Sequence, residues 1–181
     1  GTNPQQIVKL CGDEAAEAVA VIIKGQQTNG GWTYNYAHDG RRDSSVMGWQ
    51  VQALKAAVSA GCLHPGLREC MRKAAVAFKL QYCDQKTAAA PAPGKLQMGS
   101  LSAANLSQDP LGTFTYAVIG NARTTVGGNA TMTAVGTVCL EFLGEGSSME
   151  AKGGRASLRQ NICDWQKATG WPFYNWYYTT Q

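Results

Sequence analysis

GGWTY at residues 30–34 returns as GTFTY at residues 112–116, so one short motif occurs twice in the chain. Each copy lies between stretches whose apolar residues have helical spacing. A motif that recurs together with its flanking helices indicates stacked supersecondary units. The doubled motif therefore predicts a helical repeat fold and says more about fold than about a reaction.

Three helices are predicted around the first copy of the motif. The first covers residues 13–25, since acidic residues favour a helix start and glycine favours its end. The second begins at Asp43, a typical N-cap, and ends before Gly61, and the third covers residues 65–82. The apolar face of the first helix is expected to contain Ala15, Ala18, Val19 and Ile22, and that of the second Met47, Val51, Leu54 and Val58.

A fourth helix is predicted after the second copy and ends at Gly144. When Gly136 is aligned with Gly48, the apolar faces of the helices that follow the two copies coincide. A glycine inside a helix costs about 1 kcal/mol relative to alanine. Its recurrence predicts that another backbone segment packs closely at both glycines. The apolar face of the fourth helix contains Met132, Val135, Cys139 and Phe142.

A third, partial copy is predicted near the C-terminus. A fifth helix is expected over residues 150–167, and it leads into QKATGW at residues 166–171. This segment reproduces the Gln-to-Gly-Trp spacing of QTNGGW at residues 27–32. About three helix hairpins are thus expected, in an all-α fold that forms a single domain over residues 1–181.

Two segments depart from the repeat pattern. Residues 84–111 are rich in Ala, Pro, Ser and Gly and exceed the length of ordinary connections, which predicts an inserted loop. Residues 101–106 could form a short helix within it. The last stretch, residues 173–181, is dense in aromatics and predicts a helix without a terminal cap. We expect either that the chain belongs to a longer protein or that these aromatics cover the end of the stack.

The bulk composition is that of a globular protein, with 44% hydrophobic and 15% charged residues among 181. The net charge of +4 is scattered along the chain, which disfavours a nucleic-acid partner. The apolar run at residues 18–23 is far shorter than the roughly 20 residues that a membrane span requires. Nothing in the sequence decides between a cytoplasmic and an exported location.

The six cysteines show no C-x-x-C pair and no neighbouring histidine, which disfavours zinc-ribbon and redox sites. No metal or cofactor site is therefore predicted. Two interpretations stay open, namely buried free thiols that pack as small apolar residues and disulfides of an exported protein. The cysteines are Cys11, Cys62, Cys70, Cys83, Cys139 and Cys163.

A helix followed by Gln-x-x-x-Gly-Trp resembles the QW repeat of the squalene and oxidosqualene cyclases and their prenyltransferase relatives. The resemblance rests on Gln27 with its following Gly-Trp, on Gln166 with Gly170 and Trp171, and on DSSVMGWQVQAL at residues 43–54. It implies an α/α toroid. In that family the repeat glutamine bonds a helix end and the tryptophan packs against a neighbour.

Two further segments are similar to bacterial proteins of the squalene-cyclase-like group. These are TAVGTVCLEFLG at residues 133–144 and YNWYYTTQ at residues 174–181. The resemblance covers nearly the whole chain apart from residues 84–111 and is more specific for fold than for activity.

The catalytic acids of the resembled cyclases are missing. Those enzymes protonate their substrate with a D-x-D-D motif, whose last Asp resembles Asp43. The other acidic positions then hold Gly40 and Arg42, so the cluster that would make one carboxyl sufficiently acidic is absent. Neither the D-D-x-x-D motif of ionising terpene synthases nor the Asp-x-Cys zinc motif of protein prenyltransferases occurs. Asp43 is therefore interpreted as an N-cap first.

Other catalytic candidates remain, and all but Glu141 lie around the same turn. His38 beside Asp39 is the only candidate base with an adjacent acid, although a solvated loop histidine explains it more simply. Asp39, Asp43 and Glu141 are candidates for carboxylate chemistry outside the known motifs.

Two functional hypotheses follow. The first, which we favour, is a non-catalytic module that packs or binds within a larger assembly, by self-association or with the rest of a longer chain. The alternative is a cyclase-like enzyme or isoprenoid-lipid binder whose aromatics line an apolar cavity, against the simpler role of core packing. The candidate binding residues are Trp32, Tyr34, Phe114, Tyr116, Trp171, Phe173 and Trp176.

Overall fold

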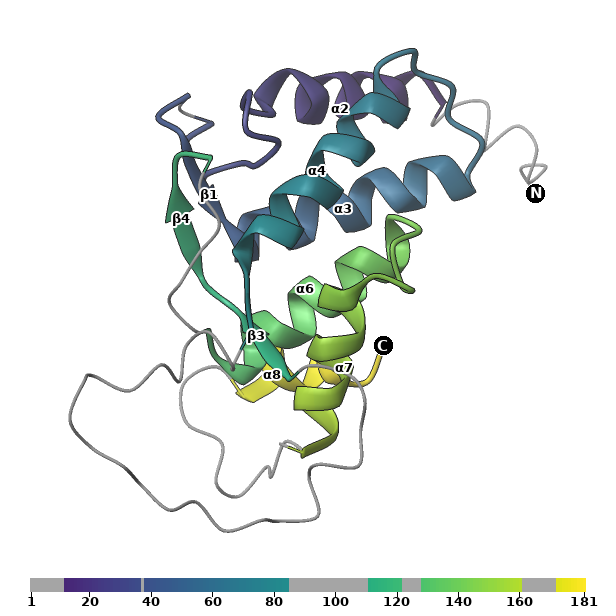
Figure 1. Cartoon of the computed structure of the whole chain (residues 1–181). Helices are drawn as coiled ribbons and strands as arrows, with labels where there is room; N and C mark the ends of the chain where they lie inside the picture. The colour runs from purple at the N-terminus through teal and green to yellow at the C-terminus, as the bar shows by residue number, and fades with distance from the viewer. Residues whose placement is uncertain (1–11, 37, 85–110, 122–127, 161–171) are drawn as a thin grey trace, which may run out of the picture.

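The computed structural model describes residues 12–36, 38–84, 111–121, 128–160 and 172–181 (Figure 1). Within these residues the chain is mostly helical, with six helices and two small antiparallel sheets. The expectation of an all-α fold is thus corrected. Backbone groups need hydrogen-bond partners where the chain leaves the helices, and short strand pairs supply them for residues 41–43, 82–84, 112–114 and 117–119.

The first copy of the motif belongs to the three helices in the upper part of Figure 1. These are α2 (Gly12–Gly25), α3 (Ser44–Ser59) and α4 (Leu67–Gln81). The three helices pack against one another, and their bounds lie close to the predicted ones.

The second copy belongs to the helices in the lower part of the same view. These are α6 (Ala130–Phe142), α7 (Met149–Gln160) and α8 (Pro172–Thr179). Helix α6 packs against α3, α4, α7 and α8 and so connects the two groups of helices. The predicted fifth helix continues to residue 167, but residues 161–171 lie outside the described part, as does the third motif copy with Gln166, Gly170 and Trp171.

The two sheets link segments far apart in the sequence. Strand β1 (Arg41–Asp43) pairs antiparallel with β4 (Ala117–Ile119), and β2 (Tyr82–Asp84) pairs antiparallel with β3 (Gly112–Phe114). The first residue of the predicted insertion therefore belongs to a strand, whereas residues 85–110, with the predicted short helix, lie outside the described residues.

The predicted apolar faces of α3 and α6 form the centre of the core. Their fully buried members are Met47, Val51, Leu54, Val135 and Cys139. Phe142 is half-buried, but Val58 is exposed, so the prediction fails in the last turns of α3. The prediction for α2 is also partly wrong, because Ala15 and Ala18 are exposed and the packed residues lie further along, from Val19 onward.

The two helix glycines do lie at close contacts, but side chains and not backbone approach them. A Cβ added at Gly48 would lie 2.7 Å from Cγ1 of Val135 and 3.2 Å from the hydroxyl of Tyr178. A Cβ added at Gly136 would lie 2.3 Å from Cδ1 of Phe114. The expectation of a packed backbone is therefore wrong, and each glycine makes room for a large side chain instead.

Four of the cysteines lie in the described residues, and all four are free thiols. Cys70, Cys83 and Cys139 are buried and Cys62 is half-buried, as the free-thiol interpretation predicts. Cys11 and Cys163 lie outside the described residues.

Candidate functional site

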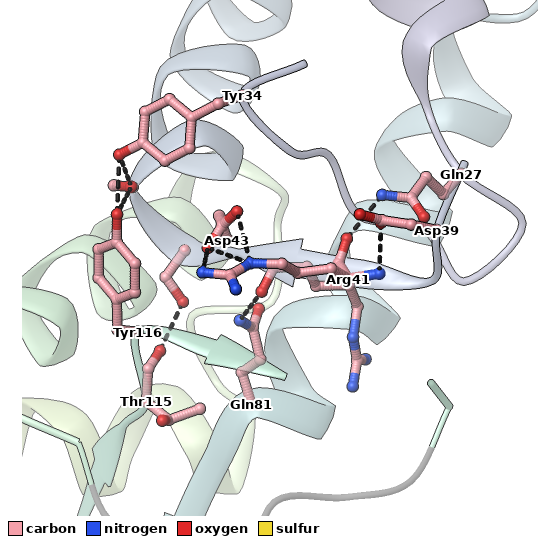
Figure 2. Close-up of polar contacts among 11 residues, drawn as sticks. Gln27, Tyr34, Asp39, Arg41, Asp43, Gln81, Thr115 and Tyr116 are labelled. Atoms are coloured by element: carbon pink, nitrogen blue, oxygen red, sulfur yellow. Dashed lines mark hydrogen bonds and ion pairs between the residues drawn. The ribbon is translucent and has the colours of Figure 1, made fainter. Parts of the chain in front are cut away.

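Strand β1 is held by two glutamines that follow or end different helices (Figure 2). The Gln27 side chain donates from Nε2 to the Arg41 carbonyl at 2.6 Å and accepts from the Gly40 N–H at 2.7 Å. Gln81, the last residue of α4, donates to the next carbonyl, that of Arg42, at 3.1 Å. The resemblance implied that the repeat glutamine bonds a helix end. Gln27 instead bonds a turn and a strand, because β1 lies between it and the start of α3.

The backbone of both motif copies reaches the start of α3. The Asp43 N–H donates to the Trp32 carbonyl at 3.0 Å, and the Ser44 N–H donates to the Tyr116 carbonyl at 2.8 Å. The Ser44 hydroxyl donates to the Thr115 carbonyl at 2.7 Å. The first copy thus bonds the N–H of the N-cap residue, Asp43. The second copy bonds the N–H of the first helical residue, Ser44.

Three hydroxyl groups meet beside this helix start. The Tyr34 and Tyr116 hydroxyls are 2.8 Å apart, and each contacts the Ser45 hydroxyl, at 2.8 and 3.4 Å, respectively. The two tyrosines occupy the same position in the two copies. Burial raises the pKa of Tyr116, so its hydroxyl stays protonated at neutral pH and keeps a proton to donate. Figure 2 shows both rings leading to this contact from different segments.

Asp43 is paired with Arg41 and does not cap α3 with its side chain. The guanidinium donates from Nε and Nη2 to the carboxylate at 3.0–3.1 Å, and the Asp43 side chain is only 2% exposed. This hydrogen bond raises the pKa of Arg41. Asp43 occupies the N-cap position with an extended backbone, but its side chain makes no capping hydrogen bond. The predicted capping role is therefore corrected to an ion pair.

The other catalytic candidates are not gathered around that carboxylate. Asp39 is exposed and accepts from the Arg41 N–H at 2.9 Å. His38 is exposed, and within the described residues no hydrogen bond or ion pair joins it to either acid. Glu141 lies on α6 and forms an ion pair with Arg155 of α7.

The predicted binding aromatics divide into buried and exposed groups. Trp32 and Phe114 are fully buried, and the Trp32 indole donates to the Ile22 carbonyl at 2.8 Å. Phe114 packs edge-on against Tyr82, with ring centroids 5.4 Å apart. Both rings therefore serve the core. The exposed group consists of Tyr34, Tyr116, Phe173 and Trp176, whereas Trp171 lies outside the described residues.

A second aromatic contact, between α3 and α8, was not predicted from the sequence. Trp49 stacks on Tyr177 with ring centroids 6.3 Å apart and an interplanar angle of 21°. Gln52 donates to the Tyr178 hydroxyl at 2.5 Å and accepts from the Tyr177 hydroxyl at 2.9 Å. Tyr174 also lies against Trp49. The spacing of Ser45, Trp49 and Gln52 along one helix face was the available signal.

The site contains hydroxyls, amides and one closed ion pair. Within the described ranges, no group of three or more His, Cys, Asp or Glu side chains could hold a metal ion. In the same ranges, no helix has both the length and the apolar character needed to cross a bilayer. Comparison of the chain with protein-family models, curated proteins and solved structures gives no match.

Proposed function

We propose that this chain is a non-catalytic α/α module of the toroid type, which acts by packing or binding. The observation that carries the proposal is the state of Asp43. Its carboxylate is buried in a two-nitrogen contact with Arg41, so it already accepts hydrogen bonds from a cation. Because both carboxylate oxygens accept from Arg41 and the side chain is only 2% exposed, this acid is not presented to a substrate, as a catalytic proton donor must be.

The assignment to a toroid is supported by the way the two copies are used. In both, a buried aromatic precedes a central helix, and the two central helices, α3 and α6, pack side by side. Gln27, which follows α2, and Gln81, which ends α4, bond adjacent carbonyls of one strand. Such repeated ties are what a stack of α/α units requires, since each unit contacts mainly its neighbours.

The direct test is an incubation with squalene, farnesyl diphosphate and geranylgeranyl diphosphate, with extraction and analysis of products. We expect no turnover from the wild-type chain or from the Asp43→Asn variant. New hydrocarbon products that disappear in Asp43→Asn would contradict the proposal and favour the cyclase-like alternative.

The same variant tests the structural role of the ion pair. Asp43→Asn should lower the free energy of unfolding by about 1 kcal/mol, since it weakens charge-assisted hydrogen bonds to an arginine that remains half exposed. Asp39→Asn is the matched control, because Asp39 is exposed and contacts only the Arg41 N–H among the hydrogen bonds described. If wild type and Asp43→Asn have the same free energy of unfolding in urea denaturation, the ion pair does not contribute to stability.

A further inference from the structure

A band of exposed aromatic rings, with hydroxyl and amide groups between them, extends along α3. It begins where the Tyr34 and Tyr116 hydroxyls meet Ser45 and continues along one helix face to Trp49 and Gln52. At its far end Tyr177 of α8 stacks on Trp49 and bonds Gln52. We call this set, Tyr34, Ser45, Trp49, Gln52, Tyr116 and Tyr177, the aromatic stripe.

The rings of the aromatic stripe are accessible although they are large. Tyr34 is 64% and Trp49 53% exposed, and Tyr116 and Tyr177 are about two-fifths exposed. Rings of this kind offer rigid contact area at a small cost in side-chain entropy, which is why tyrosine and tryptophan dominate many recognition surfaces. Core packing does not account for them, because other residues of α3 and α6 fill the core.

The polar atoms of the stripe are held in place by one another. Tyr34, Tyr116 and Ser45 hold their three hydroxyls within 2.8–3.4 Å, and the Gln52 amide is fixed between two tyrosine hydroxyls. Each hydroxyl has one donor and two acceptor positions, and the three mutual hydrogen bonds use the three protons, so the cluster keeps acceptor positions for further hydrogen bonds. Such pre-organisation lowers the entropy cost of binding.

The electrostatic character of the stripe narrows the ligand class. None of its six side chains carries a formal charge at neutral pH, and the neighbouring Arg41 and Asp43 neutralise each other. A nucleic acid or an anionic lipid headgroup would find no free cation among the stripe residues. A purely apolar chain would cover the hydroxyls without bonding them, which costs free energy.

We propose that the aromatic stripe binds an uncharged glycan, a ligand that combines apolar C–H ring faces with hydroxyls that both donate and accept. The sugar faces stack on Trp49 and Tyr177, and the sugar hydroxyls bond the Tyr34–Ser45–Tyr116 cluster. This inference rests on the proposed non-catalytic function and names the ligand class of that module.

The test is calorimetric titration of the full chain with neutral hexasaccharides of glucose, xylose and N-acetylglucosamine, with farnesol as the apolar comparison. We expect at least one hexasaccharide to bind and farnesol not to bind. Trp49→Ala should weaken that binding by about tenfold, because it removes the central stacking ring.

Two further variants separate loss of binding from loss of fold. Tyr34→Phe keeps the ring and removes one hydroxyl, so it should weaken glycan binding severalfold while the circular dichroism spectrum is unchanged. Trp176→Ala is the matched control, since Trp176 is a tryptophan exposed to the same degree as Trp49 that does not belong to the stripe, and the affinity of this variant should equal that of wild type.

The proposal is overturned if no hexasaccharide binds the folded chain, if farnesol binds in their place, or if Trp49→Ala binds glycan as well as Trp176→Ala does. None of these outcomes involves turnover. Failure here therefore leaves the non-catalytic assignment standing, and products in the incubation assay would overturn that assignment without deciding glycan binding.

Discussion

Replacement of Gly136 by alanine has two opposing effects on the free energy of unfolding. In the middle of α6, alanine favours the helix over glycine by about 1 kcal/mol. The added Cβ, however, would lie 2.3, 2.4 and 2.7 Å from three ring atoms of Phe114. Carbon atoms that attract one another are separated by about 3.5–4.0 Å, so the ring or the helix must move by an ångström or more.

The Phe114 ring has little room for that movement. It is fully buried, its edge packs against Tyr82, and a Cβ built at Gly154 of α7 would lie 3.2 Å from the opposite part of the ring. Overpacking of this kind costs about 1–3 kcal/mol, and contact with three atoms places the cost in the upper half of that range. After subtraction of the helix term, Gly136→Ala should lower the free energy of unfolding by about 1–2 kcal/mol.

Urea denaturation followed by circular dichroism measures this difference. Gly12→Ala is the control, because no atom lies within 4 Å of its added Cβ, and it should be neutral or stabilising by up to about 1 kcal/mol. Phe114→Leu in the Gly136→Ala background should cost less than it does alone, which identifies the ring as the obstacle. If Gly136→Ala is instead more stable than wild type by about 1 kcal/mol, the contact between Phe114 and α6 is refuted.

Three smaller predictions use the same protein. Tyr34→Phe and Tyr116→Phe should each destabilise by about 0.5–1.5 kcal/mol, and the double variant by less than their sum, because both remove the same hydrogen bond; additive losses would contradict the pairing. Asn129→Ala should cost about 1 kcal/mol in urea denaturation, since the Asn129 side chain caps α6, and an unchanged midpoint would speak against that cap. Burial raises the pKa of Cys70 to about 11, so at pH 8 its thiolate fraction is on the order of one thousandth. Iodoacetamide should therefore modify the half-buried Cys62 before Cys70 in peptide mass spectra, and equal rates would count against the burial of Cys70.

The helices could be predicted because their evidence is local. Apolar spacing and terminal glycines located α2, α3, α4 and α6, and the burial of Met47 and Val135 followed from the aligned faces. The strands could not be predicted in this way. Three residues are too few to show a period of two, and each strand exists only because a segment distant in the sequence supplies its partner.

The sequence predicted several residues of the candidate site but not the contacts between them. Doubling of the motif singled out Tyr34 and Tyr116, but nothing local indicated that their hydroxyls meet. Asp43 looked like a helix cap because its position and residue type fit one. Arg41, two residues earlier on the same strand, points to the same side and takes its carboxylate instead. The Asp43 carboxylate can bond either the free N–H groups at the start of α3 or the Arg41 guanidinium, and the strand geometry favours the guanidinium.

Strand β1 has a consequence for how the chain unfolds. Its carbonyls are bonded by Gln27 and Gln81, both from the first group of helices, and it pairs with β4, which follows the second motif copy. Neither group can melt without breaking bonds that complete the other, so the described residues should behave as one cooperative unit in hydrogen exchange. A protease cut between residues 84 and 111 would then leave two fragments that stay associated and that recombine after separation.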